Sequence, residues 1–431
     1  MRTHHVLTLA ALVAVAACSD SPIEPEPSLP AGQPRPAVTV VTDTTLLNSY
    51  VQSGGDAIVT ILAEPGAPAM TADLANDIEL QLESTVAAPV VNGQTLQATD
   101  VAFSETNGTV SDKYAYVTYA MRGEPTLGAV DVFQITGGEE AKLRSRAIFT
   151  DADVYSAAVS GDRLYLTTSS SDPAFTERAV LEVVVLDNNG GLPSTYSSLR
   201  FQLPSFAGTS VHVQNGKVWA VSGTGGPNTG GLTVFQASNM ARLATITLDD
   251  ARGVAGSATS GLVVVAQGTP GRTNLFNHTT NARIGTAIAS GGAATPEARG
   301  DVSVDGNWAF VAASEGGTRI LRVDGTGGTV RVNLPAPIVS GIAAELRTVN
   351  GVTTYREGNE AWIFTANGEA GVYAYYSNYP AVSSTGTPTV SLMGRLAFPA
   401  SISANFARAD TQGEWLVVAS GLGGLRILEI D

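Results

Sequence analysis

Few side chains in this 431-residue sequence could form a catalytic or metal-binding centre. Two of its 4 histidines, His4 and His5, precede an apolar leader, which leaves His212 and His278 in the body. Its 1 cysteine can supply neither an intramolecular disulfide nor the paired thiolates of a zinc or iron–sulfur site. The sequence also lacks a Gly-x-Ser-x-Gly elbow, a phosphate-binding glycine loop and a Cys-x-x-Cys-His haem motif. We therefore identify no catalytic residue, and a binding protein is favoured over an enzyme.

The residues best placed to bind a ligand stand at or near the starts of short apolar strands. If these strands line a central channel, their polar side chains would surround its mouth, where a ligand or partner binds. Acids and arginines from different strands could recognise a zwitterionic or peptide ligand. Alternatively, they could neutralise one another and plug the channel. The predicted set is Asp100, Asp153, His212, Arg252, Arg299, Asp301, Glu345, Arg408 and Asp410.

No cofactor is expected, and calcium is the metal that the sequence would best accommodate. Calcium prefers hard oxygen ligands, and Asp/Asn turns are frequent here. The segments 187–191 (DNNGG) and 151–153 (DAD) are the best local candidates, yet neither completes a known loop pattern and turn chemistry explains both. The alternative to a binding module is thus a hydrolase or lyase with a calcium-dependent site in that channel.

The charge of the chain restricts its partners. The formal net charge is −15, from 24 basic and 39 acidic residues, and only Lys113, Lys142 and Lys217 are lysines. Such a field repels nucleic acid, so a nucleic-acid partner is disfavoured. The 44% hydrophobic content is ample for a packed core.

The elements that would position the polar residues recur along the chain. Seven copies pair an apolar or aromatic strand with a second alternating strand, and Gly, Asn or Asp turns join them. Equivalent positions are separated by steps of 52, 50, 41, 45, 52 and 55 residues, as marked by Val132, Val184, Val234, Leu275, Ile320, Val372 and Ile427. This spacing predicts an all-β, seven-bladed β-propeller of four-stranded blades over residues 99–431. A pair of β-sandwiches is the alternative, which the near-constant spacing disfavours.

The seventh copy is followed by no outer strand before Asp431, so closing the ring requires a strand from elsewhere. We expect residues 78–83 (IELQLE) to supply it, with 86–91 as a weaker alternative because Pro89 would have to lie at an edge or bulge. Residues 38–98 would form an N-terminal β extension, with strands at 38–44 and 57–62 and a helical turn at 71–76. Its part from 38 to 77 is either a small subdomain or an extension packed on the propeller.

The N-terminus has the pattern of an export signal. A short basic start is followed by 12 uncharged, mostly apolar residues, 6–17, which is too short to span a bilayer. The run ends Val15-Ala16-Ala17-Cys18, which resembles the lipobox of bacterial lipoproteins. That resemblance implies a signal peptide at 1–17 and a lipid on Cys18, and a bystander cysteine after an ordinary signal peptide is the alternative.

The segment after the cysteine reads as a tether. Residues 19–37 contain 6 prolines, which favours an extended chain of up to about 60 Å. We therefore expect residues 18–37 to hold a monomeric body away from a membrane of the bacterial cell envelope. Ser19 stands where the inner-membrane retention signal known in enterobacteria would place aspartate, which favours the outer membrane.

The last repeat has a recognisable sequence. Residues 421–430 (GLGGLRILEI) resemble the LVIVD repeat of bacterial propeller proteins, and segments 231–235 and 308–312 fit the same scheme. The Asp-Pro turn that usually follows the third strand in that family is missing here. The resemblance implies the propeller fold and an envelope or secreted location, and it implies no reaction. We expect a lipid-anchored binding or scaffolding module whose partner is an envelope protein or polymer.

The lipid anchor is open to a direct test. In Cys18→Ser the thiol that would carry the lipid is absent, so the mature protein is expected to appear in the soluble fraction after cell lysis. Immunoblotting of soluble and membrane fractions measures this, with the unaltered chain as the control. A variant that still sediments with membranes contradicts the lipoprotein assignment.

Overall fold

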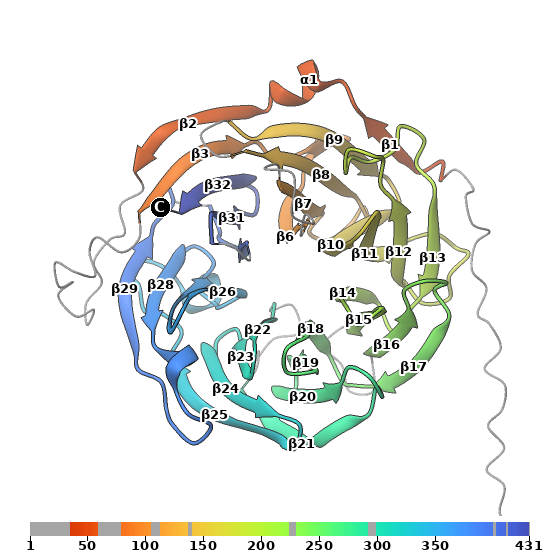
Figure 1. Cartoon of the computed structure of the whole chain (residues 1–431). Coiled ribbons are helices and arrows are strands. Elements are labelled where there is room, and N and C mark those ends of the chain that lie inside the picture. The colour runs from red at the N-terminus through yellow and green to blue at the C-terminus, as the bar shows by residue number, and fades with distance from the viewer. Residues whose placement is uncertain are drawn as a thin grey trace, which may run out of the picture.

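The computed structural model describes residues 35–58, 79–104, 113–136, 140–223, 230–291, 299–399, 402–410 and 413–430. Within these ranges the chain is almost entirely β, with seven sheets of four or five strands arranged in a ring (Figure 1). The predicted all-β, seven-bladed propeller is confirmed. In the described part of the chain no helix has the length and apolar character needed to cross a membrane. Cys18 and the leader lie outside the described residues.

Blades 2 to 6 each consist of four consecutive antiparallel strands, ordered from the channel to the rim. Blade 2 contains β10 (Ala152–Ser160), β11 (Arg163–Ser170), β12 (Ala179–Val185) and β13 (Ser198–Gln202). Blade 3 contains β14 (Ala207–Gln214), β15 (Lys217–Gly223), β16 (Gly230–Gln236) and β17 (Arg242–Thr247). Blade 4 contains β18 (Ala251–Ser257), β19 (Leu262–Gln267), β20 (Arg272–Asn277) and β21 (Arg283–Ala289). Blade 5 contains β22 (Asp301–Asp305), β23 (Trp308–Ala312), β24 (Thr318–Asp324) and β25 (Gly327–Leu334). Blade 6 contains β26 (Gly351–Glu357), β27 (Glu360–Ala366), β28 (Val372–Ser377) and β29 (Val390–Leu396).

Blades 1 and 7 have a fifth strand, and in both it comes from the N-terminal extension. Blade 1 contains β6 (Gln97–Phe103), β7 (Lys113–Ala120), β8 (Gly128–Ile135), β9 (Lys142–Phe149) and, outermost, β1 (Val38–Val41). Blade 7 contains β30 (Phe406–Ala409), β31 (Trp415–Ala419), β32 (Leu425–Ile430), β3 (Leu80–Val86) and, outermost, β2 (Val51–Ile58). The described parts of the extension, residues 35–58 and 79–98, therefore pack on the propeller.

Strand β3 closes the ring by pairing antiparallel with the last strand, β32, from Leu80 opposite Ile430 to Val86 opposite Leu425. Closure by an N-terminal strand is confirmed, although the strand runs to Val86 where we expected it to end at residue 83. Of the alternative at 86–91, Val86 ends β3, and β4 (Val90–Val91) forms a small hairpin with β5 (Gln94–Thr95).

The rest of the extension departs from the prediction in detail. Strand β1 ends at Val41 because Asp43 caps a short helix, α1 (Thr44–Asn48), by accepting hydrogen bonds from the backbone of Thr45 and Leu46. Strand β2 starts six residues before the predicted position 57. The helical turn predicted at 71–76 falls outside the described residues.

Seven hydrophobic clusters hold the ring together, one at each junction between neighbouring blades. In β15, Val218 packs in the cluster against blade 2, whereas the next residue, Trp219, packs in the cluster against blade 4. Successive side chains of a strand point to opposite faces, so both faces of this sheet are buried. The low charged content of the sequence, 15%, fits strands that have no solvated face.

A five-residue turn joins the second and third strands in each of blades 5, 6 and 7. Its second residue has a left-handed backbone: φ is 51° at Ser314, 56° at Gly368 and 57° at Gly421. That residue forms a β-bridge to the following blade, at Val349, Ala404 and Ala98 respectively. The glycine-rich segment that carries the LVIVD resemblance is thus a turn that connects blade 7 to blade 1.

The last glycine of this turn meets the end of the outer strand. At Gly424, where φ is +74°, an added Cβ would lie 2.0 Å from the carbonyl oxygen of Val86. The equivalent distances are 2.1 Å from Gly317 to Leu334 and 2.1 Å from Gly371 to Leu396, at the ends of the outer strands β25 and β29. Strand β3 therefore occupies the outer-strand position of blade 7.

This contact makes Gly424 a sensitive site for ring closure. We expect Gly424→Ala to lower the free energy of unfolding by about 2–4 kcal/mol, because the new methyl group would overlap a backbone oxygen in a left-handed turn. The control is Gly358→Ala, where φ is +57° but nothing lies within 4 Å of the added Cβ. That change should cost only about 1 kcal/mol. Urea denaturation measures both, and equal losses would contradict the closure contact.

Candidate functional site

The inner strands of blades 1 to 4 share an irregularity near their first residues. The pairing with the second strand skips one residue in each blade: Thr99 in β6, Tyr155 in β10, Thr209 in β14 and Arg252 in β18. A β-bulge of this kind re-aims a side chain and is common next to binding sites. All four of these residues line one cavity.

This cavity, of about 380 Å³, lies at the mouth of the channel, where the inner strands begin. We call it the mouth cavity. Four of the nine predicted residues line it: Asp100, Arg252, Arg299 and Asp301. Aromatic rings of Tyr155, Phe206 and Phe406 complete the wall. Its volume is in the range of small-molecule sites and is enough for a peptide side chain or a chain end.

Two of the carboxylates also serve the ring itself. An inner strand is the free edge of its blade, so some backbone N–H groups there need acceptors. Asp100 Oδ2 accepts a hydrogen bond from Ala157 N of the next blade (3.2 Å), and Asp301 Oδ2 accepts one from Val352 N of the next blade (3.1 Å). Two hydroxyl groups accept an equivalent hydrogen bond from the backbone of the next blade: Ser210 Oγ from Val254 N (3.3 Å) and Thr353 Oγ1 from Ala409 N (3.1 Å).

Burial makes these carboxylates poor acids. Loss of solvent raises the pKa of Asp301 to about 7, although the positive charge of Arg408 acts in the opposite direction. Burial likewise raises the pKa of Asp100, while Arg408 and the hydroxyl of Ser156, which donates to Asp100 Oδ2 at 2.5 Å, oppose the shift. Arg408 donates to the carbonyl of Val101 (3.3 Å) and lies 3.8 Å from Asp100 Oδ1. The channel thus contains one carboxyl group, that of Asp301, whose pKa is raised to about 7, and a second, that of Asp100, whose pKa is raised.

The two arginines of the mouth cavity differ in their partners. Arg252 forms an ion pair with Asp250, Nη2 to Oδ2, at 2.6 Å. Arg299 donates from Nη1 to the carbonyl of Thr99 (3.1 Å), and no acid of the described ranges forms an ion pair with it. Burial lowers the pKa of Arg299, which means that its charge is incompletely compensated by its surroundings. Arg299 is therefore the lining cation most available to an anionic ligand.

His212 lies further along its inner strand and is neutral at pH 7. Burial lowers the pKa of His212 to about 4, with a further small effect from the charge of Arg408. Its Nε2 lies 3.1 Å from Gln214 Oε1, and Gln214 Nε2 lies 2.8 Å from His278 Nδ1. Both histidines are therefore part of one hydrogen-bonded chain through Gln214.

The other predicted residues lie away from the mouth cavity. Asp153 accepts backbone hydrogen bonds from Met121 (3.1 Å) and Leu127 (3.2 Å), which holds the loop between β7 and β8. Asp410 follows the end of β30, at the opposite end of the channel, and forms an ion pair with Lys113. Glu345 is exposed on a 3-10 turn, η1 (Ala344–Leu346), and lies six residues before the inner strand β26, whose start we expected it to be at or near.

Among the described residues, no group of three or more His, Cys, Asp and Glu side chains is arranged to hold a metal ion. The Asp187 turn uses its carboxylate internally, because Oδ1 accepts from the backbone of Asn189 (2.8 Å) and Gly191 (2.8 Å). Asp151 forms an ion pair with Arg35 (2.8 Å). A channel calcium ion stays a prediction that metal analysis of the purified protein would test.

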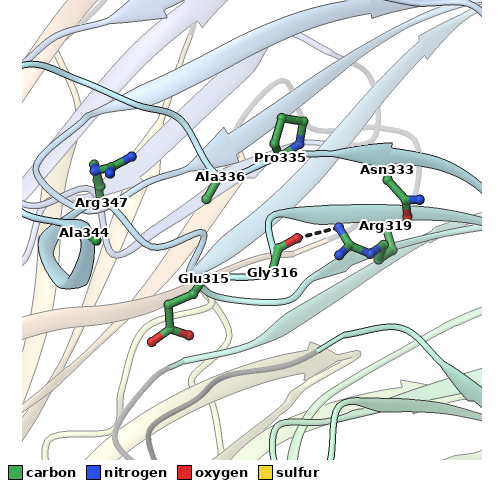
Figure 2. Close-up of a pocket in the computed structure, with 8 residues that line it drawn as sticks. All are labelled: Glu315, Gly316, Arg319, Asn333, Pro335, Ala336, Ala344 and Arg347. Atoms are coloured by element: carbon green, nitrogen blue, oxygen red, sulfur yellow. Dashed lines mark hydrogen bonds between the residues drawn. The ribbon is translucent and has the colours of Figure 1, made fainter.

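A second cavity, of about 390 Å³, lies between blades 5 and 6 and is lined by none of the nine predicted residues (Figure 2). Sequence reasoning also missed the neutral part of the mouth cavity, including Tyr155, Thr209 and Phe206. The predicted set consists of charged or titratable residues, and a β-bulge leaves no clear mark in a single sequence. A polar residue directly after a small one at the start of an inner strand, as in Ala98-Thr99 and Gly208-Thr209, is a signal that could have indicated the two threonines. It would not have indicated Tyr155, which follows Val154, or Phe206, which lies in a link.

Comparison with known proteins supports the fold. No family model and no curated protein sequence matches this chain. A solved structure described as the Dos1 propeller is similar to it, with a TM-score of 0.50 and 13% identity over 80% of this chain and 79% of that chain. At this identity the likeness shows the propeller fold alone, and the LVIVD family stays a prediction.

The raised pKa of Asp301 predicts a pH-dependent stability. A carboxyl whose pKa is about 7 when folded and about 3.9 when unfolded destabilises the protein progressively as pH rises from 4 to 7. Asp301→Asn keeps an acceptor for Val352 N without the charge, so its stability advantage over the unaltered protein should grow from pH 4 to 7 and then level off.

Thermal unfolding from pH 4 to 8 measures this difference. Asp324→Asn is the control, because local hydrogen bonds lower the pKa of Asp324 and it stays ionised from pH 5 to 8. Its effect should be independent of pH in that range. An Asp301→Asn advantage that does not change between pH 4 and 8 would contradict a buried, neutral Asp301.

Proposed function

We propose that this protein is a lipid-anchored propeller of the bacterial cell envelope that binds a protein or polymer partner at the face around the mouth cavity. The lipobox-like sequence at Cys18 and the proline-rich tether support the anchor, and the outer membrane is the favoured location. The LVIVD-like repeat supports an envelope role of the same kind. The alternative of a propeller enzyme has no support from a catalytic group among the described residues.

The observation that carries the proposal is Arg299 in the mouth cavity. Its guanidinium has five N–H donors, and the structure uses one of them, toward Thr99. A carboxylate or other anionic group from a partner would find a fork-shaped donor in a partly desolvated site, where such a bond is strong. The aromatic rings of Tyr155 and Phe406 nearby would pack against the apolar part of that group.

The face around the mouth cavity is also the more apolar one. Because strands alternate in direction, the links from each outer strand to the next inner strand and the turns between second and third strands lie on this face. Five of the nine exposed large hydrophobic side chains in the described ranges lie in these segments, with Ile338 the most exposed at 85%. The five are Val90, Phe206, Ile338, Leu346 and Leu422. They lie in four separate links and turns around the ring, so each offers a partner on this face a single apolar contact rather than part of one continuous patch.

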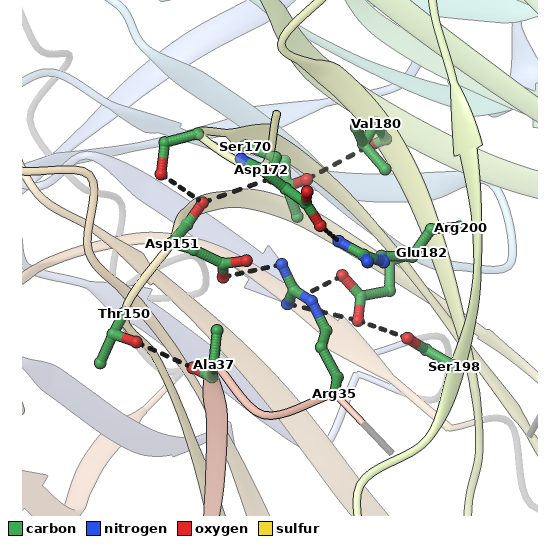
Figure 3. Close-up of polar contacts among 12 residues, drawn as sticks. Arg35, Ala37, Thr150, Asp151, Ser170, Asp172, Val180, Glu182, Ser198 and Arg200 are labelled. Carbon is green, nitrogen blue, oxygen red and sulfur yellow. Dashed lines mark hydrogen bonds and ion pairs between the residues drawn. The ribbon is translucent and has the colours of Figure 1, made fainter. Parts of the chain in front are cut away.

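The tether joins the body next to this face. Arg35 is buried where the described chain begins, and it forms ion pairs with Asp151 (2.8 Å) and with Glu182 Oε2 (3.2 Å) (Figure 3). Asp151 lies in the link between β9 and β10, and so on the mouth face. A tether of residues 19–34 would span at most about 50 Å. A partner bound at the mouth face would thus be held within reach of the membrane surface.

The proposal predicts that partner capture depends on Arg299. We expect cross-linking in intact cells to recover one or more envelope partners with the unaltered protein, and roughly tenfold less with Arg299→Ala, because an arginine anchor in a desolvated pocket contributes heavily to binding. Arg272→Ala is the control, since Arg272 is exposed on β20. Equal recovery with Arg299→Ala, at equal expression and melting temperature, would contradict the proposal.

A further inference from the structure

The N-terminal extension forms a band across the outside of three blades. Strand β1 is the outermost strand of blade 1, β2 is the outermost strand of blade 7, and α1 lies between them (Figure 1). Arg35, three residues before β1, reaches blade 2 through the carboxylate of Glu182 on β12. We call residues 35–58 the strap. Residues 19–34 of the predicted tether lead directly into Arg35, so a pull on the tether would act on Arg35 first.

The ring is complete without the strap. Blades 2 to 6 have four strands each, and blades 1 and 7 also keep four when β1 and β2 are set aside. The first part of the strap buries little: Leu47 is the buried residue of α1, and the residues of β1 are exposed or half-buried. In β3, by contrast, four of seven residues are buried. Segments with few buried contacts open locally at low free energy, so the strap is expected to open more easily than the blades.

A charged contact fastens the strap at its Arg35 end (Figure 3). Arg35 is only 5% exposed, its Nη2 donates to Asp151 Oδ1 (2.8 Å), and its Nη1 lies 3.2 Å from Glu182 Oε2. The guanidinium carbon lies 5.2 Å from the centre of the Phe149 ring. Burial alone would lower the pKa of Arg35, but the carboxylates of Glu182 and Asp151 outweigh burial and the pKa is raised. The body thus holds this side chain as a pocket holds a charged ligand.

The backbone next to Arg35 docks together with its side chain. Arg35 N donates to the carbonyl of Tyr196 (3.3 Å), and Thr150 N donates to the carbonyl of Ala37 (3.0 Å). Strand β1 then pairs with β9 over four residues. A ladder this short contributes few hydrogen bonds, so docking of β1 is expected to depend on the contacts of Arg35.

We infer that the strap is a releasable docking segment, with Arg35 as its catch, that sets how far the propeller can move from its anchored N-terminus. With the strap docked, the 16 residues 19–34 separate Cys18 from the body and span at most about 50 Å. With the strap released, the chain is first held at Leu80 in β3, and the 61 residues 19–79 could extend to about 200 Å. The change of reach rests on the lipid anchor proposed above, whereas release of the strap does not.

Hydrogen exchange measured by mass spectrometry tests the release without the lipid, in the Cys18→Ser protein. Arg35→Gln removes the charge that Asp151 and Glu182 hold, so exchange of residues 36–50 should become at least tenfold faster while residues 415–430 are unchanged. Arg272→Gln, at an exposed position on β20, is the control and should change neither segment. Unchanged exchange of residues 36–50, or equally faster exchange throughout the ring, would overturn the inference.

Two further variants separate release from damage to blade 2. Arg35→Gln alone leaves the carboxylate of Glu182 buried without this cation, which is costly in itself. Arg35→Gln combined with Glu182→Gln removes both charges and should give the same local increase in exchange. Thr39 and Ile148 lie opposite each other in the β1–β9 pair, so Thr39→Cys with Ile148→Cys can join the strap to blade 1. Oxidation should abolish the effect of Arg35→Gln and reduction should restore it; an effect that persists after oxidation would overturn the inference.

The change of reach is measured with the lipidated protein on vesicles of phosphatidylethanolamine and phosphatidylglycerol. Energy transfer is followed from a dye on an engineered thiol, Arg272→Cys, to a dye in the bilayer. Arg35→Gln should lower the transfer at least twofold, because the released chain lets the body move away from the surface. Equal transfer, with the strap shown to be released, would overturn the assignment of reach. Protein that does not bind the vesicles would contradict the anchor and not the strap, which the exchange experiment decides by itself.

Discussion

The pairing of β3 with β32 is the interaction on which the rest of the structure depends, because it makes a ring from an open row of seven sheets. Once the ring is closed, blade 7 contacts blade 1. Asn405 Nδ2 then donates to the carbonyl of Ala98 (3.1 Å), and Gly421 forms a β-bridge to the same residue. These contacts place the inner strand of blade 7 beside that of blade 1. Arg408 reaches Asp100 only across this junction, so the electrostatics of the channel depend on closure.

Some polar residues of the channel both satisfy backbone hydrogen bonds between blades and line the cavity in which a ligand could bind. Seven inner strands present free edges to one space, and Asp100, Ser210, Asp301 and Thr353 supply acceptors to neighbouring edges. The acids at the mouth are thus partly explained by the hydrogen bonds that they accept from neighbouring backbone N–H groups, which neither of the two interpretations open at the sequence level had included. The arginines are not explained in that way. Arg299 is held by one hydrogen bond, and its position in a cavity of about 380 Å³ is what favours a ligand.

The sequence predicted the repeat and its closure because both depend on strong local signals. Strand alternation and glycine turns repeat at each blade, and a last blade without an outer strand requires one from another part of the chain. The exact ends of β1 and β2 were not predictable, since the Asp43 cap and the pairing with β3 decide them. Likewise, the sequence could place Asp100 and Asp301 at the starts of inner strands, because each directly precedes a short, largely apolar segment. It could not be inferred for Glu345, which lies in an irregular link, or for Tyr155, which a bulge turns into the cavity.

Ring closure is the central claim, and hydrogen exchange measured by mass spectrometry tests it most directly. If β3 is the outer partner of β32, peptides covering residues 80–86 and 425–430 should both be strongly protected in the folded protein. In moderate denaturant the amides that each strand directs toward the other should also lose protection together, because the opening of this pair removes their acceptors, although β3 still pairs with β2 and β32 with β31. Rapid exchange of residues 80–86 while residues 425–430 stay protected would contradict closure by this strand.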